Sequence, residues 1–369
     1  MSAQQQLINN LKAKFPDIEV TGTATREQIT SCISYIPAWL QQRKVSRGIY
    51  SIPGTGSAVA AKPQQAVMQS VEVDLSNVES LIPQKDPNFV PFGNYQDVEQ
   101  VIKSRSFYPM YIYGPTGNGK STMVEQICAK HKRPLIRINL TRQTDDDALI
   151  GTRTLEDGNV KVVEGPLLIA MRTGSVALLD EIDAADCNNI MCLQAILEGK
   201  PYYFKPKNEM IVPAPGFTII ATANTKGKGS DDGRYIGTNI LNEAFLERFA
   251  LTFEQEYPQA KTEMKIINNI MELHGCVNEK FADSLIKWAE AIRRTFDDGG
   301  VDENITTRRL IHIVKAFAVF KDEKKAVQLC CNRFDVATKA AFLDLYDKIA
   351  GGEEIEPAQP PVTEESLPF

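Results

Sequence analysis

The stretch YIYGPTGNGKSTMVEQI, residues 111–127, constrains the fold of this chain more than any other feature. An aromatic run typical of a β-strand leads into it, and a run with the spacing of an amphipathic helix follows it. Between them lies G-x-x-x-x-G-K-S, in which glycines let successive backbone N–H groups and the helix N-terminus face an anion. The expected phosphate-binding residues are Gly114, Pro115, Thr116, Gly117, Asn118, Gly119, Lys120, Ser121 and Thr122.

Two side chains of this loop have separate expected roles. Lys120 would reach the β- and γ-phosphates of a nucleotide, and Ser121 would ligate Mg²⁺. ATP and Mg²⁺ are therefore the expected cofactors. A bare match to this pattern can also be a coincidental loop, so the rest of the chain has to decide between the two interpretations.

A second apolar run, VALLDE, ends in two carboxylates, Asp180 and Glu181. A buried central strand of a parallel sheet delivers such a pair to the carboxyl edge of the sheet, where ligands bind. Asp180 would hold Mg²⁺ through its water shell, and Glu181 would orient and deprotonate a water that attacks the γ-phosphate. The alternative is a strand that merely ends in solvated acids.

Three further polar side chains, later in the chain, are candidates for the same site. The run FTIIATA ends at Asn224, whose amide could hydrogen-bond the γ-phosphate and the attacking water, or could cap the next turn. FLERF ends a helix with Arg248, a residue type suited to stabilising charge on a transferred phosphoryl group, often from a neighbouring subunit; the alternative is a surface ion pair. TTRR begins a helix from which Arg308 could turn onto the nucleotide, or could pair with an acid.

The order of predicted elements gives the fold class. Strand-like and helical segments alternate over residues 86–253, which predicts an α/β fold with a parallel sheet covered by helices. Residues 259–350 show helical periodicity only. The expected divisions are a small N-terminal docking module at 1–50, a linker at 51–79, an αβα nucleotide-binding core at 80–255, an all-helical lid at 256–350 and a disordered acidic tail at 351–369.

Composition and charge argue against several classes of protein. A net charge of −6 argues against a nucleic-acid binder that uses its whole surface, although it allows a local basic patch. No apolar run approaches the roughly 18 residues that a membrane span needs, and MSAQQQLINN lacks the pattern of a signal peptide. The seven cysteines contain no C-x-x-C pair, so free thiols in a reducing compartment are expected. We expect a cytoplasmic protein without a membrane partner.

The ordered set of motifs resembles the AAA+ ATPases. Further stretches are similar to the MoxR branch of that family and closest to its cobaltochelatase ATPase subunit, the CobS type. They are IPQKDPNFVPF, LIRINLTRQTDDDALIGT, LLDEIDAAD, FTIIATANTKGKGSDDGRYIGTNILNEAFLERF and TTRRLI, and together they span roughly residues 80–350. This chain has Thr-Thr-Arg where that family commonly has Ser-Pro-Arg, but the arginine, Arg308, is kept.

The resemblance implies a AAA+ αβα core with a helical lid and a chain that assembles as a homo-oligomeric ring, a hexamer. ATP hydrolysis would then remodel a partner protein. The implied partner is a von Willebrand factor A-domain protein with a metal-ion-dependent adhesion site, and the pair would be the motor of a magnesium- and ATP-dependent cobalt chelatase. The sequence itself does not identify the client.

Two insertions have the pattern of β-hairpins. Residues 152–163 form two β-like runs around Asp157-Gly158, a strong turn signal. The resemblance places this hairpin within the second core helix, facing the pore of the ring. Residues 201–212, PYYFKPKNEMIV, indicate another hairpin, whose aromatic residues either pack against the sheet or belong to a loop that responds to the nucleotide.

Two alternative functions stay open from the sequence. Residues 1–50 carry six basic and three acidic residues, so a nucleic-acid-associated motor could use them as a DNA-binding module, although a protein-docking module is preferred. A ring that binds ATP only to assemble is the other alternative. The presence of Glu181 and Arg248 argues against it.

Overall fold

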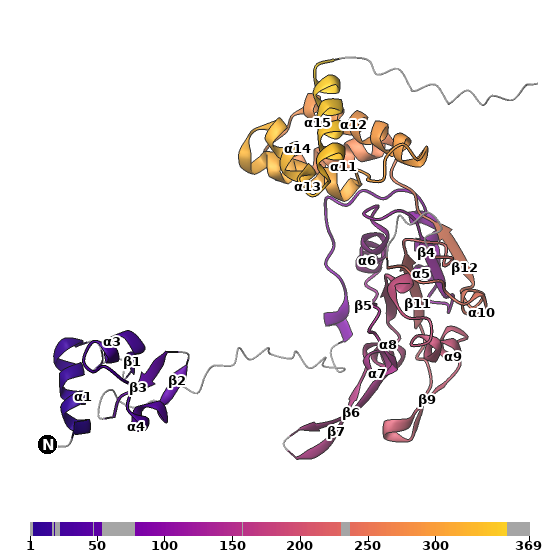
Figure 1. Cartoon of the computed structure of the whole chain (residues 1–369). Coiled ribbons are helices and arrows are strands. Elements are labelled where there is room, and N and C mark those ends of the chain that lie inside the picture. Colours follow the sequence, from indigo (N-terminus) through magenta and orange to yellow (C-terminus); the bar gives the residue numbers. More distant parts are fainter. Residues whose placement is uncertain are drawn as a thin grey trace, which may run out of the picture. The chain divides into compact units, whose positions relative to one another are not determined.

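The computed structural model describes residues 3–16, 18, 23–46, 48–53, 78–156, 158–229 and 237–352. The chain divides into two compact units, Met1–Glu72 and Val73–Phe369 (Figure 1). Most of the expected linker and nearly all of the expected acidic tail lie outside the described residues. None of the helices in the described part combines the length and the apolar character that crossing a membrane requires.

The first unit packs short helices against a three-stranded antiparallel sheet of order β1-β3-β2. Its core contains Leu11, Ile29, Leu40 and Tyr50. The elements are α1 Ala3–Lys14, β1 Thr23–Thr25, α3 Arg26–Thr30, α4 Ala38–Gln41, β2 Lys44–Ser46 and β3 Ile49–Ser51.

One helix of the first unit is shorter than its sequence pattern predicts. The sequence Thr25-Arg26-Glu27-Gln28 matches a capping box, and this box forms, with the backbone N–H of Thr25 donating to Oε1 of Gln28 at 2.8 Å. Ile29, Ile33 and Ile36 follow at helical spacing, which predicts a helix that continues to Pro37, but the helix ends at Thr30. The hydroxyls of Thr30 and Ser31 donate to carbonyl oxygens of the preceding turn, and such side-chain bonds compete with helix propagation.

The second unit is built on a five-stranded sheet of order β12-β4-β11-β8-β5. All of its pairings are parallel, which confirms the fold predicted from the alternation of strands and helices. Every residue of β8 is buried, as expected for a central strand. The strands are β4 Met110–Tyr113, β5 Leu135–Asn139, β8 Val176–Asp180, β11 Thr218–Ala223 and β12 Leu251–Glu254.

Side chains alternate between the two faces of this sheet. Val176 and Leu178 of β8 pack on one side with helices α5 (Tyr95–Ser104) and α6 (Lys120–Lys130), whereas Ala177 and Leu179 pack on the other with α8 (Pro166–Thr173). The result is a three-layered αβα core (Figure 1).

A helical region follows β12 and has its own apolar core around Trp288. Figure 1 shows these helices as a bundle that is separate from the sheet. Its α13 begins after Thr306, which caps the helix through its side chain, as the TTRR pattern predicted. The helices are α11 Ala260–Leu273, α12 Glu279–Asp297, α13 Thr307–Phe320, α14 Glu323–Cys331 and α15 Val336–Ala350.

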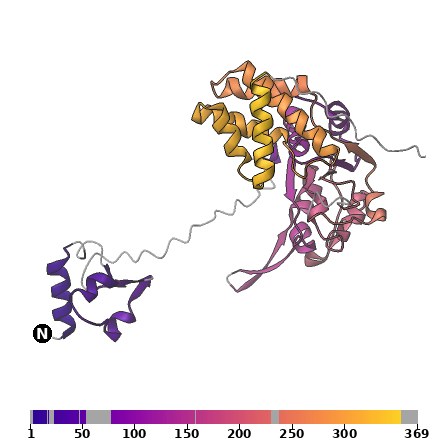
Figure 2. The same ribbon diagram turned by 45° about the horizontal axis from the view of Figure 1, so that its top comes forward.

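Both predicted hairpins form. Strands β6 (Gly151–Glu156) and β7 (Asn159–Glu164) pair in antiparallel register between α7 (Asp146–Ile150) and α8, and they project away from the sheet in both views (Figures 1 and 2). Strands β9 (Tyr202–Phe204) and β10 (Glu209–Ile211) form the other. The remaining short helices are η1 Val78–Leu81, η2 Ile182–Ala184, η3 Met191–Leu193, α9 Gln194–Leu197, η4 Lys205–Lys207 and α10 Glu243–Leu246.

Candidate nucleotide-binding site

The glycine-rich loop connects β4 to α6, as the sequence predicted. Two of its glycines have no room for a side chain. Both have positive φ, 149° at Gly114 and 68° at Gly117. A Cβ atom would lie 2.0 Å from the carbonyl oxygen of Gln255 at the first position and 2.8 Å from Oγ1 of Thr306 at the second. The loop is therefore fixed between the end of β12 and the start of α13.

The ammonium group of Lys120 lies inside the loop. It donates to the carbonyl oxygens of Gly114 and Pro115 at 2.7 and 2.9 Å and to Oδ1 of Asn224 at 3.2 Å. Burial lowers the pKa of Lys120 to about 8, although the charge of nearby Asp183 acts in the opposite direction. A desolvated ammonium held by neutral oxygens is prepared to bind an anion.

Asp180 lies at the carboxyl end of β8, beside the hydroxyl of Ser121. Oδ1 of Asp180 accepts hydrogen bonds from Ser121, at 2.6 Å, and from Thr222, and Oδ2 pairs with Arg137. Burial alone would raise the pKa of Asp180, but these hydrogen bonds and the charge of Arg137 outweigh it and lower the pKa. One carboxylate and two hydroxyls are hard oxygen donors of the kind that Mg²⁺ prefers, so these residues fit that ion.

Glu181 follows the strand in an unusual backbone conformation. Its φ of 59° and ψ of 47° are in the left-handed region, which is uncommon for a residue with a side chain. Such conformations cost of order 1–3 kcal/mol and are found at functional sites. The backbone N–H of Glu181 donates to Oγ1 of Thr222 at 3.4 Å, so the two central strands together hold the turn that presents this carboxylate.

Asn224 is held at the end of β11 by a buried carboxylate. Oδ2 of Asp183 accepts from the backbone N–H groups of Asn224 and Thr225 at 2.9 and 3.0 Å. The side-chain oxygen of Asn224 meets the ammonium of Lys120. The amide of Asn224 therefore lies next to the lysine of the glycine-rich loop.

The lid contacts the phosphate loop directly. The backbone N–H of Arg308 donates to the carbonyl oxygen of Gly117 at 3.2 Å. The loop residues 116–122 line one cavity of about 190 Å³ together with Asp180, Glu181, Asn224 and Arg308. The structure thus brings together all but three of the predicted site residues in a single cavity. Of the other three, Gly114 and Pro115 line a second, larger cavity, and Arg248 lines neither.

A buried network connects the phosphate loop to the start of α13. The hydroxyl of Tyr257 donates to the carbonyl oxygen of Thr116 at 2.9 Å, and the guanidinium of Arg293 stacks on the Tyr257 ring, 4.2 Å from its centre. Arg293 in turn makes two hydrogen bonds of 2.8 Å to Glu263, which also accepts from the hydroxyl of Thr307. The lid helix is therefore positioned by buried ionic and hydrogen-bonding contacts.

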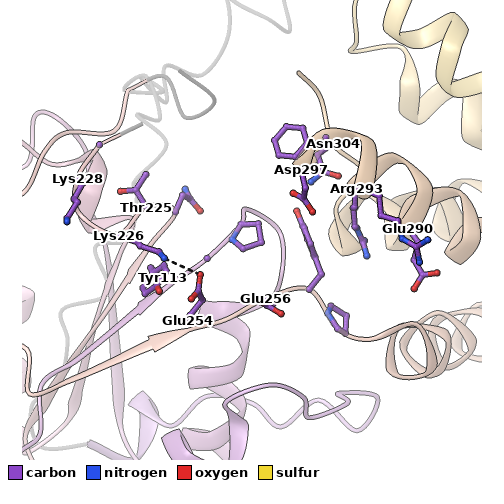
Figure 3. Close-up of a pocket in the computed structure, with 18 residues that line it drawn as sticks. Tyr113, Thr225, Lys226, Lys228, Glu254, Glu256, Glu290, Arg293, Asp297 and Asn304 are labelled. Carbon is purple, nitrogen blue, oxygen red and sulfur yellow. Dashed lines mark ion pairs between the residues drawn. The ribbon is translucent and has the colours of Figure 1, made fainter. Parts of the chain in front are cut away.

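A larger cavity of about 860 Å³ lies between the core and α12 (Figure 3). On the core side Lys226 and Glu254 pair at 3.7 Å, and Glu290, Arg293 and Asp297 come from α12 across the cavity. Charges of both signs line it, and residues 116–122 do not. The smaller cavity is therefore the candidate phosphate site, because it contains the loop, the paired acids and the lid arginine.

Arg248 does not line the phosphate cavity. Its Nε donates to Glu198 at 2.9 Å, the ion pair that was the alternative interpretation. Leu251, three residues later, pairs with Met110 at the amino end of β4, whereas the phosphate loop leaves the carboxyl end of that strand after Tyr113. Arg248 is thus at the opposite edge of the sheet from the phosphate loop of its own chain.

Sequence reasoning missed several residues that complete the site. The carbonyl of Gln255 contacts the loop through Asn118, and Thr222 and Asp183 support the acids and the amide. Arg137 brings a positive charge to Asp180. Only Asp183 had a usable signal, because it lies two residues after the paired acids within LLDEIDAAD. The others depend on which strands become neighbours.

The fold and this cavity define a P-loop nucleotide-binding enzyme. Two family models match the chain: the AAA domain of the dynein-related subfamily at residues 109–249, and the CbbQ/NirQ/NorQ C-terminal domain at residues 264–346. The first contains the loop, the paired acids and Asn224, and the second contains Arg308. The chain belongs to the AAA+ ATPases, in the MoxR branch, and is CobS-like.

Individual relatives agree with this assignment. The aerobic cobaltochelatase subunit CobS of a Sinorhizobium species is 25% identical over 288 residues, 75% of this chain and 86% of that protein. A Staphylococcus epidermidis protein is 28% identical over 221 residues, 58% of this chain and 80% of that protein. YojN of Bacillus subtilis is 27% identical over 220 residues, 58% of this chain and 68% of that protein.

Proposed function

We propose that this ATPase is the motor of a hexameric ring that couples ATP hydrolysis to the remodelling of a partner protein. The observation that carries the proposal is the β6–β7 hairpin, which projects from the core (Figures 1 and 2). Leu155 and Val160 are cross-strand neighbours next to its turn, and their exposed fractions are 78% and 65%. Exposed apolar residues on a projecting element favour contact with another protein.

In the proposed mechanism each residue of the cavity has one role. Lys120 and the loop N–H groups bind the phosphates, and Ser121 and Asp180 would hold Mg²⁺. The ion would supply positive charge that neutralises the phosphates. Glu181 orients the attacking water and takes its proton, and Asn224 contacts the γ-phosphate from the side of Lys120. Arg308 adds positive charge from the lid when it closes.

The hairpin is connected to the strand that carries the acids. Glu164, at the end of β7, accepts from Arg172 of α8 at 2.9 Å and from Lys207 at 2.7 Å. Arg172 also pairs with Glu209 of the second hairpin at 2.6 Å. Because α8 leads directly into β8, a movement at Asp180 can reach both hairpins through rigid elements.

Replacing residues 153–162 with a short Gly-Ser turn should leave ATP hydrolysis and ring assembly intact but stop remodelling of the partner. The phosphate cavity contains no residue of this segment, so hydrolysis does not depend on it. The measurements are steady-state ATPase activity, the mass of the assembly, and unfolding of a fluorescently labelled partner.

A double substitution tests the tip of the hairpin alone. Leu155→Ser with Val160→Ser removes the apolar pair, and Thr154→Ser on the opposite face is the matched control. Only the double substitution should reduce remodelling. Loss of the ring in the loop replacement would mean that the hairpin holds subunits together instead, and unchanged remodelling in every variant would refute any client role.

For the partner we propose a von Willebrand factor A-domain protein with a metal-ion-dependent adhesion site, in a complex of the cobalt-chelatase type. The support is the similarity to CobS, an aerobic cobaltochelatase subunit. For residues 1–50 we propose docking of that partner, since Tyr35 and Val45 of this unit are largely exposed. Capture of the partner by a Glu181→Gln ring held in ATP, with loss of capture when residues 1–50 are removed, is the expected result.

A further inference from the structure

Arg137 binds one oxygen of Asp180, the carboxylate that is proposed to hold Mg²⁺. It is the third residue of β5, and its guanidinium pairs with Oδ2 of Asp180, with Glu125 of α6 at 2.9 Å and with Oδ1 of Asn139 at 3.2 Å. In the register between β5 and β8, Asn139 lies beside Asp180. The edge strand β5 therefore places Arg137 next to the paired acids. A planar guanidinium with several donors suits such a bridge.

Both carboxylate oxygens of Asp180 accept hydrogen bonds in this arrangement. Oδ1 accepts from the hydroxyls of Ser121 and Thr222, and Oδ2 accepts from Arg137. The side chain of Asp180 is only 9% exposed, so its charge is poorly compensated by water. Arg137 is the cation that pairs directly with this carboxylate.

The same arginine is partly exposed to solvent and is not part of the apolar core. Its side chain is 44% exposed, and it lines the phosphate cavity together with Lys120 and Arg308. A cation at this position and Mg²⁺ compete for one carboxylate oxygen. If Arg137 were neutral, Asp180 would face the phosphates of a metal-free nucleotide as an uncompensated negative charge.

We propose that Arg137 is a positioning residue that takes the place of the metal at Asp180 whenever Mg²⁺ is absent, and so sets how strongly nucleotide binding depends on Mg²⁺. Arg137 lets nucleotide enter the site before the metal, because the carboxylate stays neutralised. It must then leave Asp180 when Mg²⁺ arrives, which weakens metal binding. The inference rests on the ATPase site and does not depend on the proposed client or partner.

The test is binding of a fluorescent ADP analogue to the full-length protein, measured once in excess EDTA and once in saturating Mg²⁺. The informative quantity is the ratio of the two Kd values, EDTA over Mg²⁺. In Arg137→Met this ratio should rise about five- to tenfold, mostly through weaker binding in EDTA. Arg137→Lys keeps the charge and should change the ratio less.

Three further variants separate this role from a structural one. Glu125→Gln removes the partner of Arg137 on α6 but leaves Asp180 paired, and Arg142→Met removes an exposed arginine just after β5. Both should keep the wild-type ratio. In an Asp180→Asn background, Arg137→Met should no longer change the ratio, because the charge that Arg137 compensates is gone.

Each outcome decides the proposal. If Arg137→Met changes both Kd values by the same factor, the arginine only supports the fold, and the proposal is wrong. A ratio that falls would mean that Arg137 assists the metal rather than replacing it. A ratio that rises equally in the Asp180→Asn background would also overturn the proposal, since the effect would not pass through Asp180.

Discussion

Lys120→Ala should abolish measurable nucleotide binding, whereas Glu181→Gln should keep binding and lower turnover by about a hundredfold or more. Lys120 lies inside the phosphate loop with an exposed fraction of 7%, and it donates hydrogen bonds to a loop carbonyl and to Asn224. When this side chain is removed, water cannot supply the positive charge that is lost. Glu181 is exposed and lies in a left-handed turn that lines the same cavity. Binding and chemistry therefore depend on different side chains.

Titration of a fluorescent ATP analogue and steady-state phosphate release distinguish the two variants. Lys130→Ala, an exposed lysine at the other end of α6, is the matched control and should behave as wild type in both assays. Circular dichroism spectra that match wild type would show that the fold is intact. Undiminished turnover in Glu181→Gln would remove this residue from its proposed role, and normal binding in Lys120→Ala would do the same for the lysine.

The parts of the fold that local patterns encode were predictable. The loop between β4 and α6 follows from glycine spacing between a strand and a helix, and the buried strand β8 follows from an unbroken apolar run. The start of α13 follows from the capping threonine, Thr306. Because carboxyl ends of parallel strands meet at one edge, Asp180 and Asn224 could be assigned to the same site without knowing the strand order.

The parts that depend on strand order could not be predicted. In the sequence, Arg137 is an ordinary charged residue in a short strand. It pairs with Asp180 only because β5 lies next to β8. Thr222 contacts Asp180 because β11 lies on the other side of β8. In the first unit, strands of three residues are too short to show an alternation of apolar and polar residues. Helix α3 ends where the hydroxyls of Thr30 and Ser31 donate to backbone carbonyl oxygens, although the apolar residues continue at helical spacing.

The position of Arg248 in the fold bears on the oligomeric state that we propose. The arginine lies before β12, whose amino end adjoins the amino end of β4, and the phosphate loop is at the far end of β4. A side chain cannot span the sheet to reach the phosphates of its own chain. If Arg248 contributes to hydrolysis, another subunit has to present it, and a closed ring gives every site one such neighbour.

Arg248→Ala should lower ATP turnover on the order of a thousandfold, and activity should return in part when this variant is mixed with Glu181→Gln. In a mixed ring, an Arg248→Ala subunit has an intact Glu181 and can receive the intact arginine of a Glu181→Gln neighbour. The interface between these two subunits therefore has both functional side chains.

Glu198→Gln is the matched control, because it breaks the ion pair at Arg248 but keeps the arginine, and it should retain most of the activity. Turnover of the mixture is measured against each variant alone after subunit exchange is confirmed by mass. Mixed rings as inactive as both parents would exclude action in trans, and a Glu198→Gln variant as inactive as Arg248→Ala would assign the effect to the lost ion pair.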